Sequence, residues 1–391
     1  MERRRLVGAL ALASAVALTA AACGSSGSSG SSSGGKKTFT IGFQGPLSGD
    51  NQQLGINGLD GVKTAIAEAN ADSSLPFTLK LVQSDDQGDP AVAPTAAQKL
   101  VDNSDVIALV GPMFSGATKA SEQLFTDANL LSVSPSATNP TLTTLGFKTF
   151  YRVIATDAGQ GKAAADYISK VLKPTTVYSL DDASEYGTGL SKVIESELGV
   201  NGTKFTHDSI NPTKDYTAEA TKIVAAKPDV LYYSGYYAEF ALLSKALKSA
   251  GFTGKIMSGD GSLDPEYIKQ AGAANAEGAL ISCPCLLAGA DPNASAFVTS
   301  YKSTNGGAEP GTYSAEAYDA TNGIIAVLKQ LGTGATRESV SAAFGKLDIK
   351  GLTKQIKFTP TGEVTDASFY IYQVKGGQLT VLGQTSKLIG G

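Results

Sequence analysis

The sequence of 391 residues contains one histidine, His207, and only three cysteines, Cys23, Cys283 and Cys285. A metal site with several histidine ligands is therefore excluded, and the absence of a CxxC pair excludes a cysteine-rich zinc site. The part able to fold lacks the GxxxxGK(S/T), GxGxxG and GxSxG patterns of nucleotide-binding loops and hydrolase nucleophiles. We therefore expect no enzyme activity, no cofactor and no bound metal.

Charge is also scarce. Only 17% of the residues are charged and the formal net charge is −4, which argues against recognition of a nucleic-acid backbone as the main task. Hydrophobic residues make up 42% of the chain, which is ample for a core. At about 150 residues per domain, this length suggests two domains.

The first 35 residues are predicted to precede the folded part. Residues 1–22 join a basic start to an apolar stretch that is shorter than the about 20 residues of a membrane span, so we expect a secretion signal peptide. Small residues before Cys23 resemble the lipobox of bacterial lipoproteins, although Ala20 and Ala22 also suit ordinary signal cleavage. Residues 23–35 are then a lipid-anchored Ser/Gly linker. We expect an extracytoplasmic protein anchored to the outer face of the cell membrane.

Strand and helix patterns alternate along the rest of the chain. Strands are predicted at residues 38–44, 77–81, 105–111 and 229–234. Apolar residues recur at helical spacing in residues 59–69, 190–198, 240–250 and 340–347. The alternation predicts an α/β fold with parallel sheets, in which ligands bind beyond the carboxyl ends of the strands.

Two hydroxyl-rich segments follow predicted strands, at residues 111–118 and 132–140. Ser115 is predicted to cap the next helix, whose free backbone N–H groups would form an anion site. Simple capping and turn chemistry would explain the same composition.

These segments also carry a resemblance to a known family. The matching segments, in chain order, are GPLSG at 45–49, DDQGDP at 85–90, GPMFSGAT at 111–118, SPSATNP at 134–140, EYGTG at 185–189, YYSGYYAE at 232–239 and MSGDG at 257–261. The chain resembles the branched-chain amino acid-binding proteins (leucine/isoleucine/valine-binding type) of bacterial ABC importers, which are type I periplasmic binding proteins.

The resemblance implies two Rossmann-like α/β lobes with parallel-rich sheets, joined by three hinge crossovers. The implied boundaries are residues 36–157 plus 287–364 for lobe 1, and residues 158–286 plus 365–391 for lobe 2. The crossovers would lie near residues 156–158, 285–288 and 363–365. Closure of the lobes on a ligand would then be a hinge motion.

The resemblance also implies a ligand-binding set. Ser115 matches the family's carboxylate-binding serine, and Thr138 matches the threonine that binds both the carboxylate and the ammonium group, with the backbone at Ser136 and Ala137 beside them. Asp260 matches the acid that pairs with the ligand's ammonium group, and is one methylene shorter than the usual glutamate. The side-chain pocket matches Tyr186, Tyr236 and, where the family often has an aromatic residue, Leu54. A disulfide that joins the positions of Gly88 and Phe114 in the best-known members is missing here.

Other polar features have simpler interpretations. Asp85, Asp86 and Asp89 suit turns and helix caps better than a calcium loop. His207 is predicted to follow a strand and to lie at the surface. Cys283 and Cys285 are expected either to form a short disulfide or to remain two half-buried thiols; a redox role is the less favoured alternative.

The expected function is capture of an amino acid, branched-chain by resemblance, and its delivery to a membrane permease by a monomeric binding lipoprotein. One alternative keeps the fold and changes the ligand to an amide or an aromatic acid. A ligand-sensing module of the same fold is another. A secreted hydrolase would need His207 beside a serine and an acid, and is the least favoured class.

Overall fold

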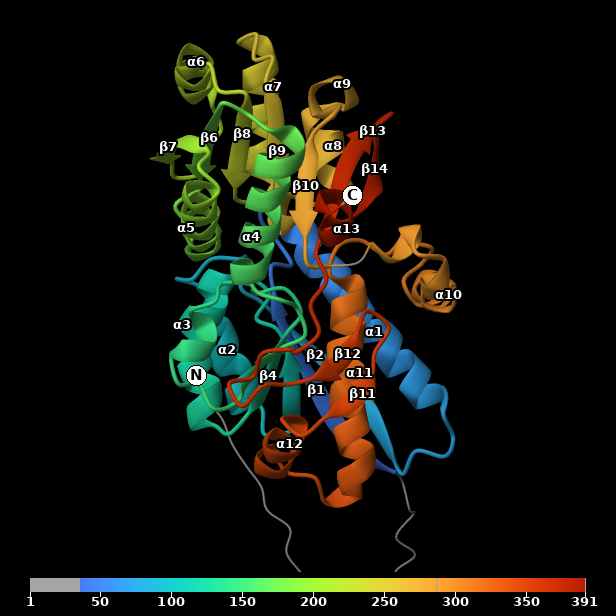
Figure 1. The fold of residues 1–391 in the computed structure, drawn as a ribbon. Coiled ribbons are helices and arrows are strands. Elements are labelled where there is room, and N and C mark those ends of the chain that lie inside the picture. Colours follow the sequence, from blue (N-terminus) through green and yellow to red (C-terminus); the bar gives the residue numbers. More distant parts are fainter. Residues whose placement is uncertain (1–35, 286, 391) are drawn as a thin grey trace, which may run out of the picture. The chain divides into compact units, whose positions relative to one another are not determined.

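Two parallel-rich β-sheets with helices packed against them organise the residues that the structure describes, 36–285 and 287–390 (Figure 1). The structure is a computed structural model. The predicted signal peptide, Cys23 and the Ser/Gly linker lie outside the described residues. An α/β fold with parallel-rich sheets was predicted from the sequence, and this prediction is confirmed.

The first sheet has five parallel strands in the order β2-β1-β3-β4-β5. Its strands are β1 (Lys37–Gly45), β2 (Phe77–Asp85), β3 (Val106–Val110), β4 (Leu131–Ser134) and β5 (Phe150–Arg152). Every residue of β3 is buried, as expected for an apolar strand between two helical layers.

Helices cover both faces of this sheet. Figure 1 shows α2 and α3 on one side, and α1 and α11 on the other. The bounds of these four helices are α1 (Gln52–Ala71), α2 (Ala93–Asp102), α3 (Ser115–Asp127) and α11 (Ser314–Leu331). Two further helices, α10 (Ser295–Thr304) and α12 (Arg337–Phe344), precede and follow α11 in the chain. Helix α1 approaches the start of α11 closely because Gly61 has no side chain: a Cβ atom there would lie 2.2 Å from the Ser314 carbonyl oxygen. A small hairpin of β11 (Asp348–Lys350) and β12 (Gln355–Lys357) follows α12.

The second sheet has seven strands in the order β14-β13-β10-β9-β8-β6-β7. Its strands are β6 (Thr176–Asp181), β7 (Lys204–Ser209), β8 (Val230–Ser234), β9 (Lys255–Ser258), β10 (Leu280–Cys283), β13 (Tyr370–Lys375) and β14 (Gln378–Gln384). Pairing is parallel from β10 to β7, whereas β13 and β14 join the other edge in antiparallel pairs. Strand β8 is fully buried, like β3.

The helices of the second sheet pack in two groups, α4 with α5, and α7 with α6 and α8. They are α4 (Asp157–Tyr167), α5 (Glu185–Val200), α6 (Thr217–Ala226), α7 (Tyr237–Ser249), α8 (Pro265–Ala271), α9 (Ala273–Ala276) and α13 (Thr385–Ile389). A π-helical turn at Ile168–Leu172 extends α4, and 3-10 turns lie at Leu142–Thr144, Asp260–Ser262, Ala288–Ala290, Pro292–Ala294 and Gly332–Gly334.

Three local predictions differ from the structure. The helix predicted at residues 340–347 ends at Phe344, so Leu347 packs into the core from a turn. Helix α3 begins at Ser115 with Phe114 as its N-cap residue, so the prediction that Ser115 caps the helix is wrong. His207 lies within strand β7 rather than after a strand, although its side chain is partly exposed as predicted.

Candidate functional site

Five of the predicted binding residues, and Asp157, which was not predicted, follow the carboxyl ends of strands, where open parallel sheets hold their ligands. Ser115, Thr138 and Asp157 follow β3, β4 and β5, while Tyr186, Tyr236 and Asp260 follow β6, β8 and β9. All six side chains are buried except that of Tyr236, which is half-buried.

Ser115 and the loop of residues 136–139, here called the hydroxyl loop, form one side of the site. The Asn139 N–H donates to Ser115 Oγ at 3.2 Å, and the Ser136 hydroxyl donates to the Met113 carbonyl oxygen at 2.6 Å. The Thr138 hydroxyl is fully buried and makes no hydrogen bond of ordinary geometry. Buried polar atoms normally find partners, and the group that this hydroxyl interacts with is the Asp157 carboxyl, although not with hydrogen-bond geometry.

Arg152 holds the hydroxyl loop in place. Its Nη1 donates to the carbonyl oxygens of Ala137 and Asn139, both at 2.8 Å, and its Nε donates to Glu363 Oε2 at 2.7 Å. The guanidinium group is completely buried, and its charge is paired with Glu363. Arg152 therefore fixes the backbone of the loop through the carbonyl oxygens of the residues on either side of Thr138.

Asp260 forms the opposite side of the site with two tyrosines. The Tyr186 hydroxyl donates to Asp260 Oδ1 and the Tyr313 hydroxyl donates to Oδ2, each at 2.7 Å. The Gly261 N–H donates to the Tyr186 oxygen at 3.1 Å. Gly259 leaves room for this arrangement, because a Cβ atom there would lie 2.5 Å from the same hydroxyl.

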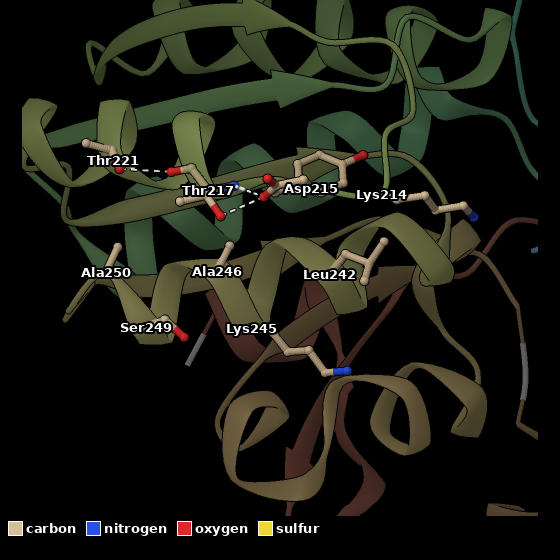
Figure 2. Close-up of a pocket in the computed structure, with 10 residues that line it drawn as sticks. Lys214, Asp215, Thr217, Thr221, Leu242, Lys245, Ala246, Ser249 and Ala250 are labelled. Carbon is tan, nitrogen blue, oxygen red and sulfur yellow. Dashed lines mark hydrogen bonds between the residues drawn. The ribbon is translucent and has the colours of Figure 1, made fainter.

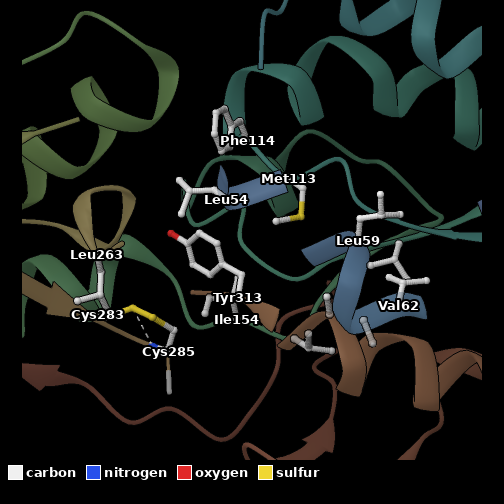
Figure 3. Packing of buried hydrophobic residues seen from close by; sticks show 14 of the residues in the cluster. Leu54, Leu59, Val62, Met113, Phe114, Ile154, Leu263, Cys283, Cys285 and Tyr313 are labelled. Carbon is white, nitrogen blue, oxygen red and sulfur yellow. Dashed lines mark hydrogen bonds between the residues drawn. A yellow bond between two sulfur atoms is a disulfide. The ribbon is translucent and has the colours of Figure 1, made fainter. Parts of the chain in front are cut away.

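Tyr313 reaches Asp260 from the other sheet. It is the residue before α11, and its φ of 68° lies in the left-handed region, which bulky residues seldom adopt. Such backbone strain clusters at functional sites, where the surrounding structure imposes it. Figure 3 shows the Tyr313 ring pointing its hydroxyl toward the part of the core that contains Leu54 and Phe114.

Asp157 is a second buried carboxylate beside Asp260. Neither of its oxygens has a hydrogen-bond donor of good geometry, while its backbone N–H donates to the Thr138 carbonyl oxygen at 2.9 Å. Burial and the neighbouring Asp260 charge raise the pKa of Asp157, whereas the nearby Thr138 hydroxyl and Arg152 act in the opposite direction.

Burial also raises the pKa of Asp260, against the lowering effect of hydrogen bonds from Tyr313, Tyr186 and Gln160. In the described part of the chain, neither Asp157 nor Asp260 forms an ion pair. Two buried carboxylates without a cationic partner are costly unless a ligand supplies the positive charge.

Apolar side chains complete the site. Leu54 is fully buried at the start of α1 and belongs to the same core cluster as Met113, Phe114 and Tyr313. The Tyr186 and Tyr236 rings lie 5.2 Å apart, measured between centroids. The site therefore joins a hydroxyl-lined side, an acidic side and an apolar wall.

Two of the cavities in the described part of the chain have a charged or aromatic lining. A cavity of about 620 Å³, here called the outer cavity, is lined by Phe114 and Lys119 from the first sheet's side and by Glu185 and Tyr236 from the second. Another, of about 390 Å³, lies between α6 and α7 and carries Lys214 and Lys245 on its wall (Figure 2). None of the predicted binding residues lines this second cavity.

The remaining polar predictions mostly agree with the structure. Asp85, Asp86 and Asp89 accept backbone N–H bonds within turns, and no group of residues able to hold a metal ion occurs among those described. His207 Nδ1 lies 2.5 Å from Glu195 Oε1, and no serine hydroxyl between residues 36 and 390 is hydrogen-bonded to it. Cys283 and Cys285 form a disulfide, one of the two expected states.

The sequence did not single out Asp157, Gln160 or Tyr313. Asp157 does follow a strand, but β5 has only three residues and its pattern is too short to identify. Gln160 donates to the Ser282 carbonyl oxygen at 3.1 Å and has a buried Oε1 without a partner. Tyr313 is 53 positions from Asp260 in the sequence, so only the tertiary structure brings them together.

Comparison with known proteins shows the family of this chain. The family described as periplasmic binding protein matches residues 38–378, which is most of the chain. The chain belongs to this family. A Leu/Ile/Val-binding protein of Rhizobium johnstonii is 30% identical over 345 residues, which cover 87% of this chain and 92% of that relative.

Solved structures of the family have the same fold. A leucine-binding protein from Thermotoga maritima has a TM-score of 0.81 and 27% identity, covering 88% of this chain and 98% of its own. A branched-chain amino acid transporter substrate-binding protein from Streptococcus pneumoniae, in complex with isoleucine, also has a TM-score of 0.81 and 27% identity, with 89% and 100% covered. No helix in the described part of this chain is long and apolar enough to cross a membrane.

Proposed function

We propose that this chain captures an α-amino acid with a branched apolar side chain and delivers it, chemically unchanged, to the permease of an ABC importer. The observation that carries the proposal is the pair of buried carboxylates, Asp157 and Asp260, which lack a cationic partner in the described residues. Beside Asp157 lies a buried hydroxyl, Thr138 Oγ1, which makes no hydrogen bond of ordinary geometry. A zwitterion offers a cation to the first group and an acceptor to the second.

The proposed binding mode follows from these contacts. The ammonium group lies between Asp157 and Asp260, with its three donors facing carboxylate oxygens. The ligand carboxylate accepts from the hydroxyls of Ser115 and Thr138, and the backbone at Ser136 and Ala137 lies beside it. The first-turn N–H groups of α3 add donors and a favourable dipole. The ligand side chain packs against the pocket residues Leu54, Tyr186 and Tyr236.

The acidic side favours an amino acid over the alternative ligands. An aromatic acid without an amino group would bring a third negative charge toward Asp157 and Asp260, which is unfavourable in a buried site. An amide would leave both carboxylates without a cation. A hydrolase is disfavoured because His207 is bonded to Glu195 and lies on β7, away from the predicted binding residues.

Ligand capture is proposed to occur by closure of two lobes with the boundaries given above, residues 36–157 plus 287–364 and residues 158–286 plus 365–391. Hydrogen bonds between the two proposed lobes support this mechanism. Asn57 Nδ2 donates to Asp264 Oδ2 at 2.8 Å, and the Tyr313 hydroxyl donates to Asp260. Solution scattering should give a smaller radius of gyration with saturating L-leucine than without it. Identical curves would contradict hinge closure.

The cellular setting is part of the same proposal. The names of the relatives support a branched-chain ligand and a transport role. We infer that a signal peptide directs the protein out of the cytoplasm, and that a lipid on Cys23 anchors it as a monomer near its permease.

A thermal-shift screen tests the function directly. The purified protein is heated with L-leucine, L-isoleucine, L-valine, an aliphatic amide that has no amino group, and benzoate as an aromatic acid. A ligand at 100 times its dissociation constant should add about 2.7 kcal/mol to the free energy of unfolding. Stabilisation by the amino acids and not by the amide or benzoate is expected. Stabilisation by benzoate alone would contradict the proposal.

A further inference from the structure

Phe114 makes an aromatic contact between the two sheets at the edge of the candidate site. Its ring is stacked on that of Tyr236, with centroids 4.3 Å apart and planes inclined by 24°. Phe114 precedes α3 and follows a strand of the first sheet, whereas Tyr236 precedes α7 and follows a strand of the second. Offset stacking of this kind is a favourable arrangement of two rings.

The stacked pair separates the buried site from the outer cavity. Both rings line that cavity of about 620 Å³ on one side. On the other side, Tyr236 contacts Tyr186, whose hydroxyl is bonded to Asp260. Phe114 itself is only 6% exposed, so the pair forms a wall between the acidic side of the site and the exterior.

The turn after β2, in the first sheet, fixes the position of the Phe114 ring. Gly88 has a φ of 71°, and a Cβ atom on it would lie 2.8 Å from the ring. The ring therefore packs directly against the backbone of the turn after β2. From this support it extends to Tyr236.

We propose that Phe114 is a gating residue, which keeps the mouth of the site closed by stacking on Tyr236. The inference rests on the proposed function and adds to it a residue that controls ligand release. An amino acid bound next to Asp260 can leave toward the outer cavity only after the two rings separate. Loss of the stack should therefore speed dissociation more than it slows association.

A nearby contact provides a matched control. Lys119 Nζ lies 3.0 Å from Glu185 Oε2 and also joins the two sides across the outer cavity. This ion pair is at the exposed rim, where such pairs contribute little. If any contact between the two sheets' sides of the outer cavity were enough to slow ligand release, loss of the ion pair and loss of the stack would change the dissociation rate equally.

Release of radiolabelled L-leucine from the full chain tests the gate. Phe114→Ala should increase the dissociation rate by about 10-fold and change the association rate by less than about 3-fold. Phe114→Tyr, which keeps a ring, should restore the slow rate, and Lys119→Met should stay within about 2-fold of the wild type. Equal dissociation rates for Phe114→Ala and Lys119→Met would overturn the proposal.

A second measurement needs no ligand. Because the sequence contains no tryptophan, Phe114→Trp places a single tryptophan in the stack, and its emission can be excited selectively. Adding Tyr236→Ala should shift its emission to the red and increase its quenching by acrylamide. No change would overturn the gate, because the ring would then not be covered by Tyr236. If no amino acid binds the wild type, the proposed function is wrong. The tryptophan emission with and without Tyr236→Ala would still show whether the stack closes the mouth of the site.

Discussion

Replacing Asp260 with asparagine removes a buried charge from the site while keeping the size of the side chain. Removing one member of a buried charge pair costs about 2–5 kcal/mol, because the other charge loses its partner. Here Asp157 would still face the ammonium group, which places the expected loss near the lower end, at about 2–3 kcal/mol. At about 1.4 kcal/mol for each factor of ten, L-leucine should bind about 30- to 140-fold more weakly to Asp260→Asn.

Calorimetric titration of L-leucine at pH 7 measures this effect. The matched control is Asp319→Asn, which also neutralises a buried carboxylate, one held by the N–H groups of Leu352 and Thr353 outside the site. The control should bind leucine within about 3-fold of the wild type, whatever its stability. If Asp260→Asn also binds within 3-fold, the ammonium assignment is wrong, and the ligand is an uncharged amide or an acid without an amino group.

Four further predictions concern the side-chain pocket, the protons released on binding, a buried glutamate and the lipid anchor. Leu54→Ala should change the order of affinity among leucine, isoleucine and valine while amino acid binding is retained; titrations that give the same order as the wild type would contradict its place in the pocket. Leucine binding should release protons, because an ammonium group lowers the raised pKa values of Asp157 and Asp260, so affinity should rise with pH; calorimetry in two buffers detects this, and proton uptake would refute it. Burial raises the pKa of Glu122 from 4.5 to about 8, so the folded state keeps a proton that the unfolded chain loses. The free energy of unfolding should then fall with rising pH across that interval, by up to about 1.4 kcal/mol per pH unit, and urea titrations of Glu122→Gln should show a flatter slope. Cys23→Ala should release the protein from membranes; a wild type found entirely soluble outside the cell, with an unmodified Cys23, would refute the anchor.

Sequence patterns predicted the parts of the fold that depend on local periodicity. Strands β3 and β8 are continuous apolar runs, and their buried positions follow from that pattern alone. The order of strands in each sheet is not local, and the periodicity of the sequence did not predict it. Leu347 shows the limit of the method, since an apolar residue at helical spacing can reach the core from a turn.

The candidate site was predictable to a similar degree. Ser115, Thr138 and Asp260 lie in segments that the family resemblance identified. Asp157 and Tyr313 could not be found in this way, because their roles depend on distances between segments far apart in the chain. One of the two tyrosine hydroxyls that bond to Asp260 is that of Tyr313, which precedes a helix of the first sheet, and no spacing in the sequence indicates that contact.

The bonds of Arg152 have a consequence for how mutational data on this protein should be interpreted. Arg152 links the carbonyl oxygens of the hydroxyl loop to Glu363, which lies beside a predicted crossover. In a saturation screen scored by uptake, substitutions at either end of this link should deplete as strongly as those at Ser115, although neither residue is proposed to touch the ligand. The set of sensitive positions would therefore include residues such as Arg152 and Glu363, which support the hydroxyl loop. It would overestimate the number of residues that contact the amino acid.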